Sequence, residues 1–227
     1  MYKHIYFIGI GGIGMSAIAR YYNFKGLKVS GYDKTPSELT HALESEGIEV
    51  HYEDNIDYVP KNIDETLVVY TPAIPKDMGE LVYVQQAGYR VIKRSRTLGE
   101  IARGQHCLAV AGTHGKTTVS SMITQILILN NLDPTAVIGG RLPLINSNGR
   151  SGKSEHMVCE SCEFVNTFLQ MSPDVSVLLN IDDDHLDFFG TMDNLVASFS
   201  KFIGMSHTAY INGDDHLARR AAEGISA

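Results

Sequence analysis

The chain of 227 residues has few cysteines, no run of basic residues and no long apolar segment, and each shortage excludes a class of protein. Three cysteines cannot build a disulfide framework. Cys159 and Cys162 have C-x-x-C spacing, but no second pair or nearby His-x-His completes a four-ligand zinc site. We expect reduced thiols, with a redox pair as the alternative.

Charge and hydropathy exclude further classes of protein. The formal net charge of −7 and the lack of a Lys/Arg cluster argue against a nucleic-acid surface, which needs concentrated positive charge. The first apolar stretch is brief and interrupted by glycines, so neither a signal peptide nor a membrane span is predicted. Hydrophobic residues make up 44% of the chain, enough for a packed core. We expect a cytoplasmic globular protein with no nucleic-acid or membrane partner.

Strand and helix patterns alternate along the chain, which is typical of βαβ units in a parallel sheet. The first unit runs from a strand at 5–8 through Gly9-Ile10-Gly11-Gly12-Ile13-Gly14 to a helix at 15–25 and a strand at 28–32. This G-x-G-x-x-G turn lets a diphosphate approach a helix N-terminus, and Asp33 stands where an acidic residue usually meets a ribose hydroxyl. The motif fits NAD, FAD or a nucleotide-sugar diphosphate, and a purely structural turn is the alternative.

Further strands are predicted at 49–51, 67–70 and 90–92, with helices near 38–46 and 79–87 between them. Thr71-Pro72-Ala73-Ile74-Pro75 follows one of these strands, at the edge where open α/β sheets bind ligands, although two prolines also suit a rigid loop. A helix near 97–103 closed by Gly104 indicates a boundary near residue 105. We expect a Rossmann-like parallel-sheet domain at 1–105 and a second α/β domain at 106–227.

The second domain opens with a phosphate-binding pattern. An apolar strand at 107–111 runs into a glycine-rich turn that ends in Gly115-Lys116-Thr117, and a helical run at 119–129 follows. Lys116 can reach the β and γ oxygens of a nucleotide, and the Thr117 hydroxyl can ligate Mg²⁺. Val110 replaces the first glycine of the general pattern, and a glycine turn with an exposed lysine is the alternative. The predicted ATP-binding residues are Gly112, Thr113, His114, Gly115, Lys116, Thr117 and Thr118.

Carboxylates follow two strands of this second domain. Glu160 ends a short apolar run and Glu163 comes three residues later, while a strand at 175–181 leads into Asp182-Asp183-Asp184-His185-Leu186-Asp187. Phosphate-bound Mg²⁺ needs few protein oxygens, so Thr117 and Glu160 would suffice, and His185 can ligate a second cation. For most carboxylates at 182–187 we favour a solvated turn that caps a helix.

Taken together, these motifs resemble the Mur ligases of peptidoglycan synthesis, over essentially the whole chain. The resemblance implies that the first glycine loop holds the diphosphate of a UDP-sugar and not a nicotinamide cofactor. The residues that it implies for UDP-sugar binding are Gly9, Gly11, Gly12, Ile13, Gly14, Asp33, Thr71, Pro72, Ala73 and Arg94.

The same resemblance assigns roles in the second domain. It implies that Lys116 binds phosphate, that Thr117 and Glu160 hold Mg²⁺, and that His185 is a further metal ligand; Lys116 and His185 are the implied catalytic residues. Many relatives have Glu-Ala-Asp-Glu where this chain has Glu160-Ser161-Cys162-Glu163. The substitution keeps the metal carboxylate but loses the aspartate, and the C-x-x-C spacing becomes incidental.

The implied reaction is ATP-dependent amide formation with ATP and Mg²⁺ as cofactors. The lactyl carboxylate of UDP-N-acetylmuramate attacks the γ-phosphoryl group, and the amine of L-alanine then attacks the acyl phosphate. Closure of the domains would protect that intermediate from water. Family members continue past the segment that matches residue 227. The P-loop ATPase-like central domain is therefore expected to be incomplete here, and this chain alone to be weak or inactive in catalysis.

Three other functions stay open. A ligase that recycles the murein tripeptide shares these motifs and differs in the amine donor. A UDP-sugar-binding module without catalysis would need only the first domain. An NAD-dependent oxidoreductase fits the first glycine loop and Asp33 but gives residues 112–118 no role.

Overall fold

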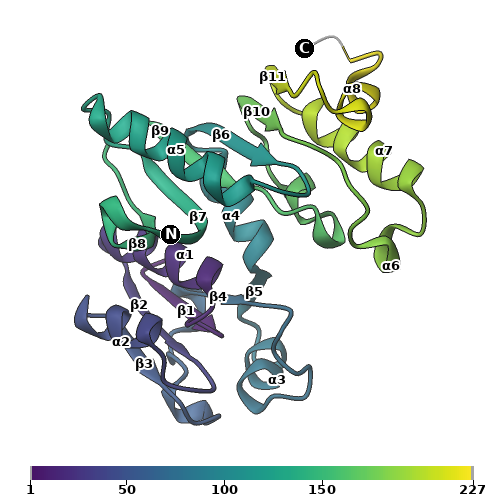
Figure 1. Cartoon of the computed structure of the whole chain (residues 1–227). Helices are drawn as coiled ribbons and strands as arrows, with labels where there is room; N and C mark the ends of the chain where they lie inside the picture. Colours follow the sequence, from purple (N-terminus) through teal and green to yellow (C-terminus); the bar gives the residue numbers. More distant parts are fainter. Residues whose placement is uncertain (1, 226–227) are drawn as a thin grey trace. The chain divides into compact units, whose positions relative to one another are not determined.

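Two largely parallel sheets organise the chain in a computed structural model that describes residues 2–225 (Figure 1). The contacts divide the chain into two units. The first extends to Thr97 and includes residues 149–151, and the second comprises residues 98–148 and those from 152 onward. This division falls inside α4 (Arg94–Ala102). The predicted α/β fold class is confirmed.

The first unit is a five-stranded sheet in the order β3-β2-β1-β4-β5. Its elements are β1 (His4–Ile8), α1 (Ile13–Phe24), β2 (Lys28–Tyr32), α2 (Glu38–Ser45), β3 (Glu49–His51), η1 (Ile56–Tyr58), η2 (Ile63–Glu65), β4 (Thr66–Tyr70), α3 (Gly79–Gln86) and β5 (Arg90–Lys93). All neighbouring strands are parallel, and Ile8 is level with both Tyr32 and Tyr70. The chain therefore leaves β1, β2 and β4 at one common edge, where the predicted ligand residues follow.

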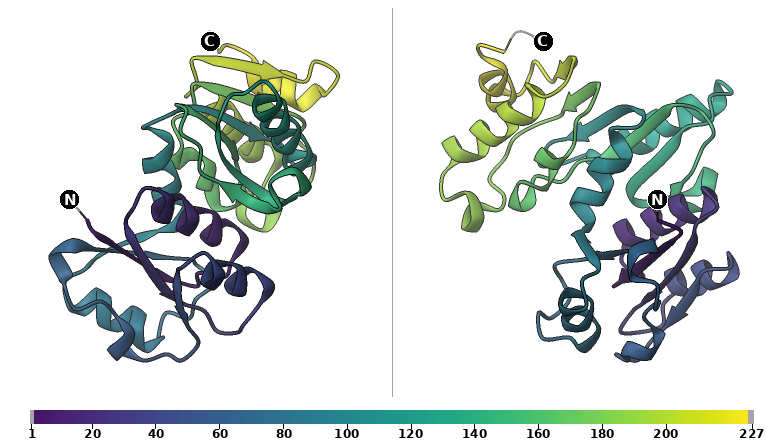
Figure 2. Two further views of the ribbon diagram at one scale, coloured as in Figure 1. Left: turned by 90° about the vertical axis from the view of Figure 1, so that its left-hand side faces the viewer. Right: turned by 180° about the vertical axis from the view of Figure 1, so that it is seen from behind.

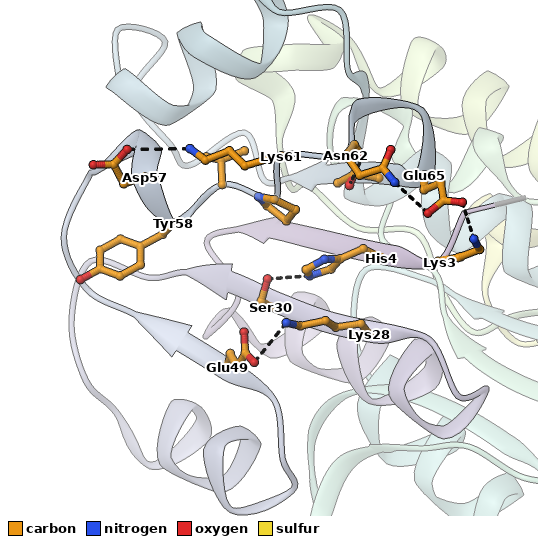
Figure 3. A pocket seen from close by; sticks show the side chains of 13 residues that line it. Lys3, His4, Lys28, Ser30, Glu49, Asp57, Tyr58, Lys61, Asn62 and Glu65 are labelled. Atoms are coloured by element: carbon orange, nitrogen blue, oxygen red, sulfur yellow. Dashed lines mark hydrogen bonds and ion pairs between the residues drawn. The ribbon is translucent and has the colours of Figure 1, made fainter.

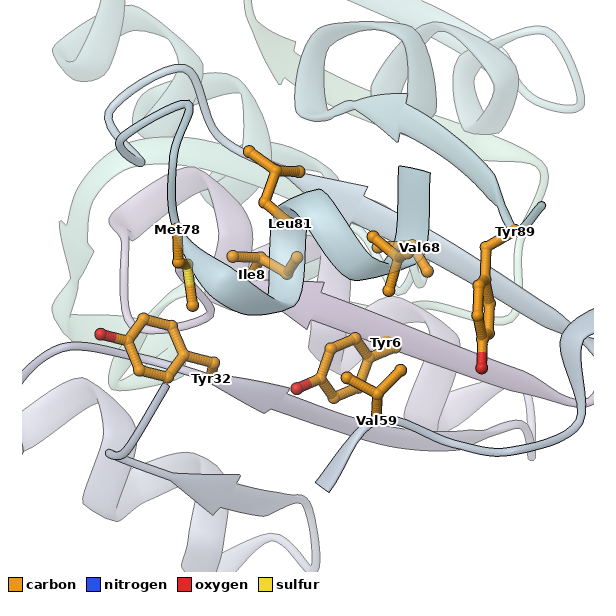
Figure 4. Packing of buried hydrophobic residues seen from close by; sticks show 9 residues of the cluster. Tyr6, Ile8, Tyr32, Val59, Val68, Met78, Leu81 and Tyr89 are labelled. Carbon is orange, nitrogen blue, oxygen red and sulfur yellow. The ribbon is translucent and has the colours of Figure 1, made fainter. Parts of the chain in front are cut away.

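Helices cover the sheet of the first unit along its length. α1 packs against β1, β2 and α2 (Figure 2). Tyr6, Ile8 and Val68 of the sheet form one buried cluster with Leu81 and other residues beneath α3 (Figure 4). Strand alternation directs Ile5 and Phe7, which are equally buried, to the opposite face. Both faces of β1 are thus apolar, as expected of a central parallel strand.

The core of the first unit contains a buried carboxylate. Glu80 is completely buried, accepts a hydrogen bond from the Tyr6 hydroxyl at 2.6 Å and lies 2.9 Å from His51 Nε2. The Asn55 amide donates to the same carboxylate at 3.1 Å. Burial, with the nearby charge of Glu80, raises the pKa of Tyr6 far above its usual range, so the hydroxyl stays a donor. Asp54 accepts from the amides of Gly79 and Glu80, and the network thereby ties the chain after β3 to the start of α3.

The second unit contains a six-stranded sheet in the order β11-β10-β6-β9-β7-β8. Its elements after α4 are β6 (His106–Ala111), α5 (Lys116–Leu129), β7 (Thr135–Leu142), η3 (Pro143–Ile145), β8 (Ser147–Arg150), β9 (His156–Glu160), η4 (Phe164–Gln170), β10 (Val175–Leu178), α6 (Leu186–Phe189), α7 (Met192–Ile203), β11 (Thr208–Ile211) and α8 (His216–Ala222). β6 is central and parallel to both neighbours, with Ala111 level with Leu178 and Val110 level with Glu160.

Most predicted elements match observed ones to within a few residues, with three informative differences. α4 begins at Arg94 and not near residue 97, so Arg94 lies at a strand–helix junction. The strand predicted at 175–181 ends at Leu178, because residues 179–182 instead form the loop that faces the P-loop. β7, β8 and α7 were not predicted, although α7 buries an apolar stripe that includes Leu195, Phe199 and Phe202.

The structure bears on two sequence predictions, which concern membrane spans and the cysteines. No helix within residues 2–225 has the length and apolar character needed to cross a membrane. The cysteines are thiols in this structure, with Cys107 and Cys159 buried. Burial, helped by Asp174, raises the pKa of the Cys107 thiol to about 12, which makes it a poor nucleophile at neutral pH.

We expect Tyr6→Phe to lower the free energy of unfolding by about 1–3 kcal/mol, because the buried Glu80 carboxylate loses one of its donors. The matched control is Tyr89→Phe, which removes a hydroxyl bonded at 2.6 Å to the neutral carbonyl of Pro60 and should cost about 0.5–1.5 kcal/mol. Urea unfolding measures both values. A loss for Tyr6→Phe no larger than the control value would contradict the importance of the buried carboxylate.

Candidate functional site

The loop between β6 and α5 has the backbone that a phosphate cradle requires. Gly112 and Gly115 have positive φ angles of 137° and 83°, which side chains other than glycine rarely adopt. A Cβ at Gly112 would also lie 3.1 Å from the backbone of Asn180. α5 begins directly at Lys116, so its unpaired N-terminal amides face the loop. Thr118 is exposed on the first turn of this helix.

Lys116 folds back over this loop. Its Nζ donates to the carbonyl oxygens of Gly112 at 2.6 Å and Thr113 at 3.1 Å, and lies 3.1 and 3.2 Å from the two carboxylate oxygens of Glu163. The Lys116 side chain is 15% exposed and that of Glu163 only 2%. This geometry differs from the exposed lysine of the alternative interpretation.

Thr117 and Glu160 come together beside Lys116. The Thr117 hydroxyl donates to Glu160 Oε2 at 2.8 Å, and the Gly139 amide donates to the same oxygen at 2.7 Å. A Cβ at Gly139 would lie 2.5 Å from the Glu160 carboxylate, so a side chain here would displace that carboxylate from its present position. Hydroxyl and carboxylate oxygens are the ligands that Mg²⁺ prefers, so the neighbouring Thr117 and Glu160 side chains fit this cation.

His185 lies in a different group. The ligand atoms of Glu163, Asp184 and His185 are all within 4.8 Å of one another, and the Phe164 ring packs against the imidazole with centroids 4.7 Å apart. His185 has a φ of 55°, a left-handed conformation that is uncommon for residues other than glycine. The structure thus divides the predicted metal residues into Thr117 with Glu160, and His185 with Glu163 and Asp184.

The loop after β10 supports the glycine-rich loop from the other side. Asn180 accepts from the His114 amide at 2.8 Å and donates to the His114 carbonyl at 3.1 Å. The Asp182 amide donates to the Thr113 hydroxyl at 2.8 Å. Sequence reasoning did not single out Asn180 or Gly139. The available signals were that Asn180 lies shortly after a strand and that Gly139 belongs to a Gly-Gly pair.

In the first unit, the structure gathers most of the predicted UDP-sugar residues around one glycine turn. Gly9 has a φ of 88°, with Thr71 and Ile74 lying against it, and α1 starts at Ile13 after the cap residue Gly12. The Arg94 side chain lies over Gly14. Pro72 and Ala73 are exposed at the same edge of the sheet.

Asp33 has a local role in this turn. Its Oδ2 accepts a hydrogen bond from the Gly11 amide at 2.7 Å. The Asp33 carboxylate therefore orders the glycine turn itself, and the proposed contact with a ribose hydroxyl would have to use its remaining capacity.

A pocket of about 480 Å³ lies at the opposite edge of the same sheet (Figure 3). Lys3, Lys28 and Lys61 line it, and each pairs with a carboxylate: Glu65, Glu49 and Asp57 respectively. His4 bonds to Ser30 at 2.8 Å, and burial, followed by the charge of Lys28, lowers its pKa. None of the predicted site residues lines this pocket.

Family models match nearly all of the chain. The Mur ligase family catalytic-domain model matches residues 4–106, and the Mur ligase middle-domain model matches residues 110–226. The second match alone covers more than half of the 227 residues.

Curated relatives and solved structures agree with these matches. A UDP-N-acetylmuramate–L-alanine ligase of Flavobacterium johnsoniae is 47% identical over 202 residues, 88% of this chain and 45% of the relative. One from Porphyromonas gingivalis is 46% identical over 207 residues, 89% of this chain and 45% of the relative. This chain thus spans about 45% of the length of these relatives.

Two solved structures share the fold. A UDP-N-acetylmuramate–alanine ligase from Thermotoga maritima has a TM-score of 0.87 and 27% identity, over 97% of this chain and 51% of that one. A UDP-N-acetylmuramate:L-alanyl-gamma-D-glutamyl-meso-diaminopimelate ligase from Neisseria meningitides has a TM-score of 0.86 and 24% identity, over 98% of this chain and 75% of that one. With two family models matched in order along its length, the chain belongs to the Mur ligase family.

Proposed function

We propose that this protein joins L-alanine to the lactyl carboxylate of UDP-N-acetylmuramate at the expense of ATP, as part of peptidoglycan precursor synthesis in the cytoplasm. The observation that carries the proposal is the pairing of Thr117 with Glu160 at 2.8 Å, directly beside Lys116 in a glycine-rich loop. A phosphate-binding lysine next to two magnesium-type oxygen donors is what phosphoryl transfer to a carboxylate needs.

In the second unit, different residues would bind the phosphates of the nucleotide and its metal ions. Backbone amides at the start of α5 would bind the phosphates, and the Lys116 ammonium would offset charge on the transferred γ-phosphoryl group. Thr117 and Glu160 would hold Mg²⁺, which would supply charge neutralisation at the phosphate oxygens. His185, with Asp184 and Glu163 beside it, would serve a second cation.

The first unit would bind the UDP-sugar. A diphosphate fits the positive N-terminal end of α1, where the Arg94 side chain lies over Gly14. Thr71, Pro72 and Ala73 follow β4 at the same edge and would contact the rest of the ligand. We also propose a domain boundary near residue 105, between α4 and β6, which the separation of the two family matches supports.

L-alanine is the preferred amine donor in this proposal. The curated relatives at 45–49% identity are L-alanine ligases, and they support this choice. Recycling of a murein tripeptide remains the second candidate because the Neisseria structure, with a tripeptide-type name, has a nearly equal TM-score. Its 24% identity supports only the shared fold.

Thr117→Ala should reduce the gain in ATP affinity that Mg²⁺ provides by about tenfold, because one oxygen ligand is lost. Affinity for metal-free ATP should stay near the wild-type value. Calorimetric titration with and without Mg²⁺ measures both. Ser121→Ala, on the next turn of α5, is the matched control and should change neither value. An unaltered Mg²⁺ effect in Thr117→Ala would exclude this hydroxyl as a ligand.

Gly14→Ala should weaken UDP-N-acetylmuramate binding at least about tenfold, because the new Cβ would lie 2.2 Å from Arg94 Nη1 and displace the guanidinium. Gly213→Ala introduces a methyl group into open space and is the control. Titration of both variants with the UDP-sugar and with NADH tests the assignment. Binding of NADH by the wild type in preference to the UDP-sugar would favour an oxidoreductase.

A further inference from the structure

Glu163 is a buried carboxylate beside the residues proposed for a second cation, and its contact with Lys116 has no role in the proposed reaction. It sits three residues beyond Glu160, after the end of β9, and the two carboxylates have separate partners. Glu160 bonds to the Thr117 hydroxyl and the Gly139 amide, whereas Glu163 contacts the Lys116 ammonium with both oxygens. One therefore lies on the magnesium side of the loop and the other on the lysine side.

The contacts of Lys116 leave it no capacity for a phosphate. An ammonium group has three donors, and here its acceptors are the Gly112 carbonyl, the Thr113 carbonyl and the Glu163 carboxylate. A triphosphate that binds this loop must replace at least one of them. The carboxylate is the exchangeable partner, because the two carbonyls belong to the loop backbone itself.

The surroundings of Glu163 make that exchange dependent on charge. Glu163 is 2% exposed, so its negative charge is poorly screened by water. The groups that face it are Lys116 from α5 and, within 4.8 Å, the ligand atoms of Asp184 and His185. A metal-free triphosphate would bring further negative charge against this carboxylate, while a triphosphate complexed with a cation brings less.

We propose that Glu163 is a positioning and specificity residue: it holds the Lys116 ammonium in the nucleotide-free loop and opposes the binding of a polyphosphate that carries no divalent cation. This inference rests on the proposed function of the loop in ATP binding. Glu163 acts through Lys116 and need not touch the nucleotide.

The first test compares polyphosphate binding without divalent cations. Glu163→Gln keeps the shape and one acceptor oxygen but removes the charge. In EDTA it should bind inorganic tripolyphosphate and ATP at least about tenfold more tightly than the wild type, and the difference should shrink when Mg²⁺ is added. Asp183→Asn removes one negative charge from the exposed turn before α6 and is the matched control. Equal or weaker metal-free binding by Glu163→Gln, relative to that control, would overturn the proposal.

A second measurement needs no nucleotide and distinguishes this inference from the function on which it rests. An ammonium with all three protons bonded exchanges them slowly, so ¹⁵N-lysine NMR of the wild type should show a protected signal that Lys116→Arg removes. Glu163→Gln should lose or broaden this signal. If the wild type bound no polyphosphate, ATP binding by this chain would be refuted. A Lys116 signal unchanged by Glu163→Gln would refute the positioning role, whatever the binding result.

Discussion

The parallel pairing of β6 with β9 on one side and β10 on the other is the constraint on which the second unit depends. It places Val110 level with Glu160 and Ala111 level with Leu178, so three segments far apart in the sequence leave the sheet at one edge. The glycine-rich loop, the carboxylates after β9 and the Asn180 loop can then contact each other without long connections. A slip of one residue in the β6–β9 pairing would point Glu160 to the opposite face and away from Thr117.

The same constraint explains what the sequence could and could not predict. The two glycine turns were predictable because strand, turn and helix follow one another within a dozen residues and the chemistry is local. The pairing of Thr117 with Glu160 was predicted from ligand chemistry. Gly139, Asn180 and the contact between Glu163 and Lys116 depend on strand order and register, which no local pattern encodes. α7 was missed although its apolar residues recur at helical spacing, so that omission was avoidable.

Each unit contains a buried glutamate whose carboxylate has polar partners. Glu80 in the first unit accepts from a tyrosine hydroxyl and a backbone amide beside His51, and Glu163 in the second contacts a lysine. Burying an unpaired carboxylate costs several kcal/mol, so each fixes the elements around it in a definite arrangement. The two differ in what can replace their partners. The partners of Glu80 are Tyr6, His51 and Asn55, whereas the partner of Glu163 is Lys116, the residue proposed to bind phosphate.

Asp33 shows how an expected contact can take a different form. Sequence spacing placed this carboxylate near a ribose, as in dinucleotide-binding domains, where it would discriminate between cofactors. Here Asp33 Oδ2 accepts from the Gly11 amide, so part of its bonding capacity stabilises the turn that we propose for diphosphate binding. A carboxylate bonded in this way lowers the positive potential at the helix N-terminus. Arg94, lying over Gly14, restores positive charge on the other side of the turn. The turn therefore suits an anion that approaches along Arg94, as in the UDP-sugar binding that we propose for the first unit.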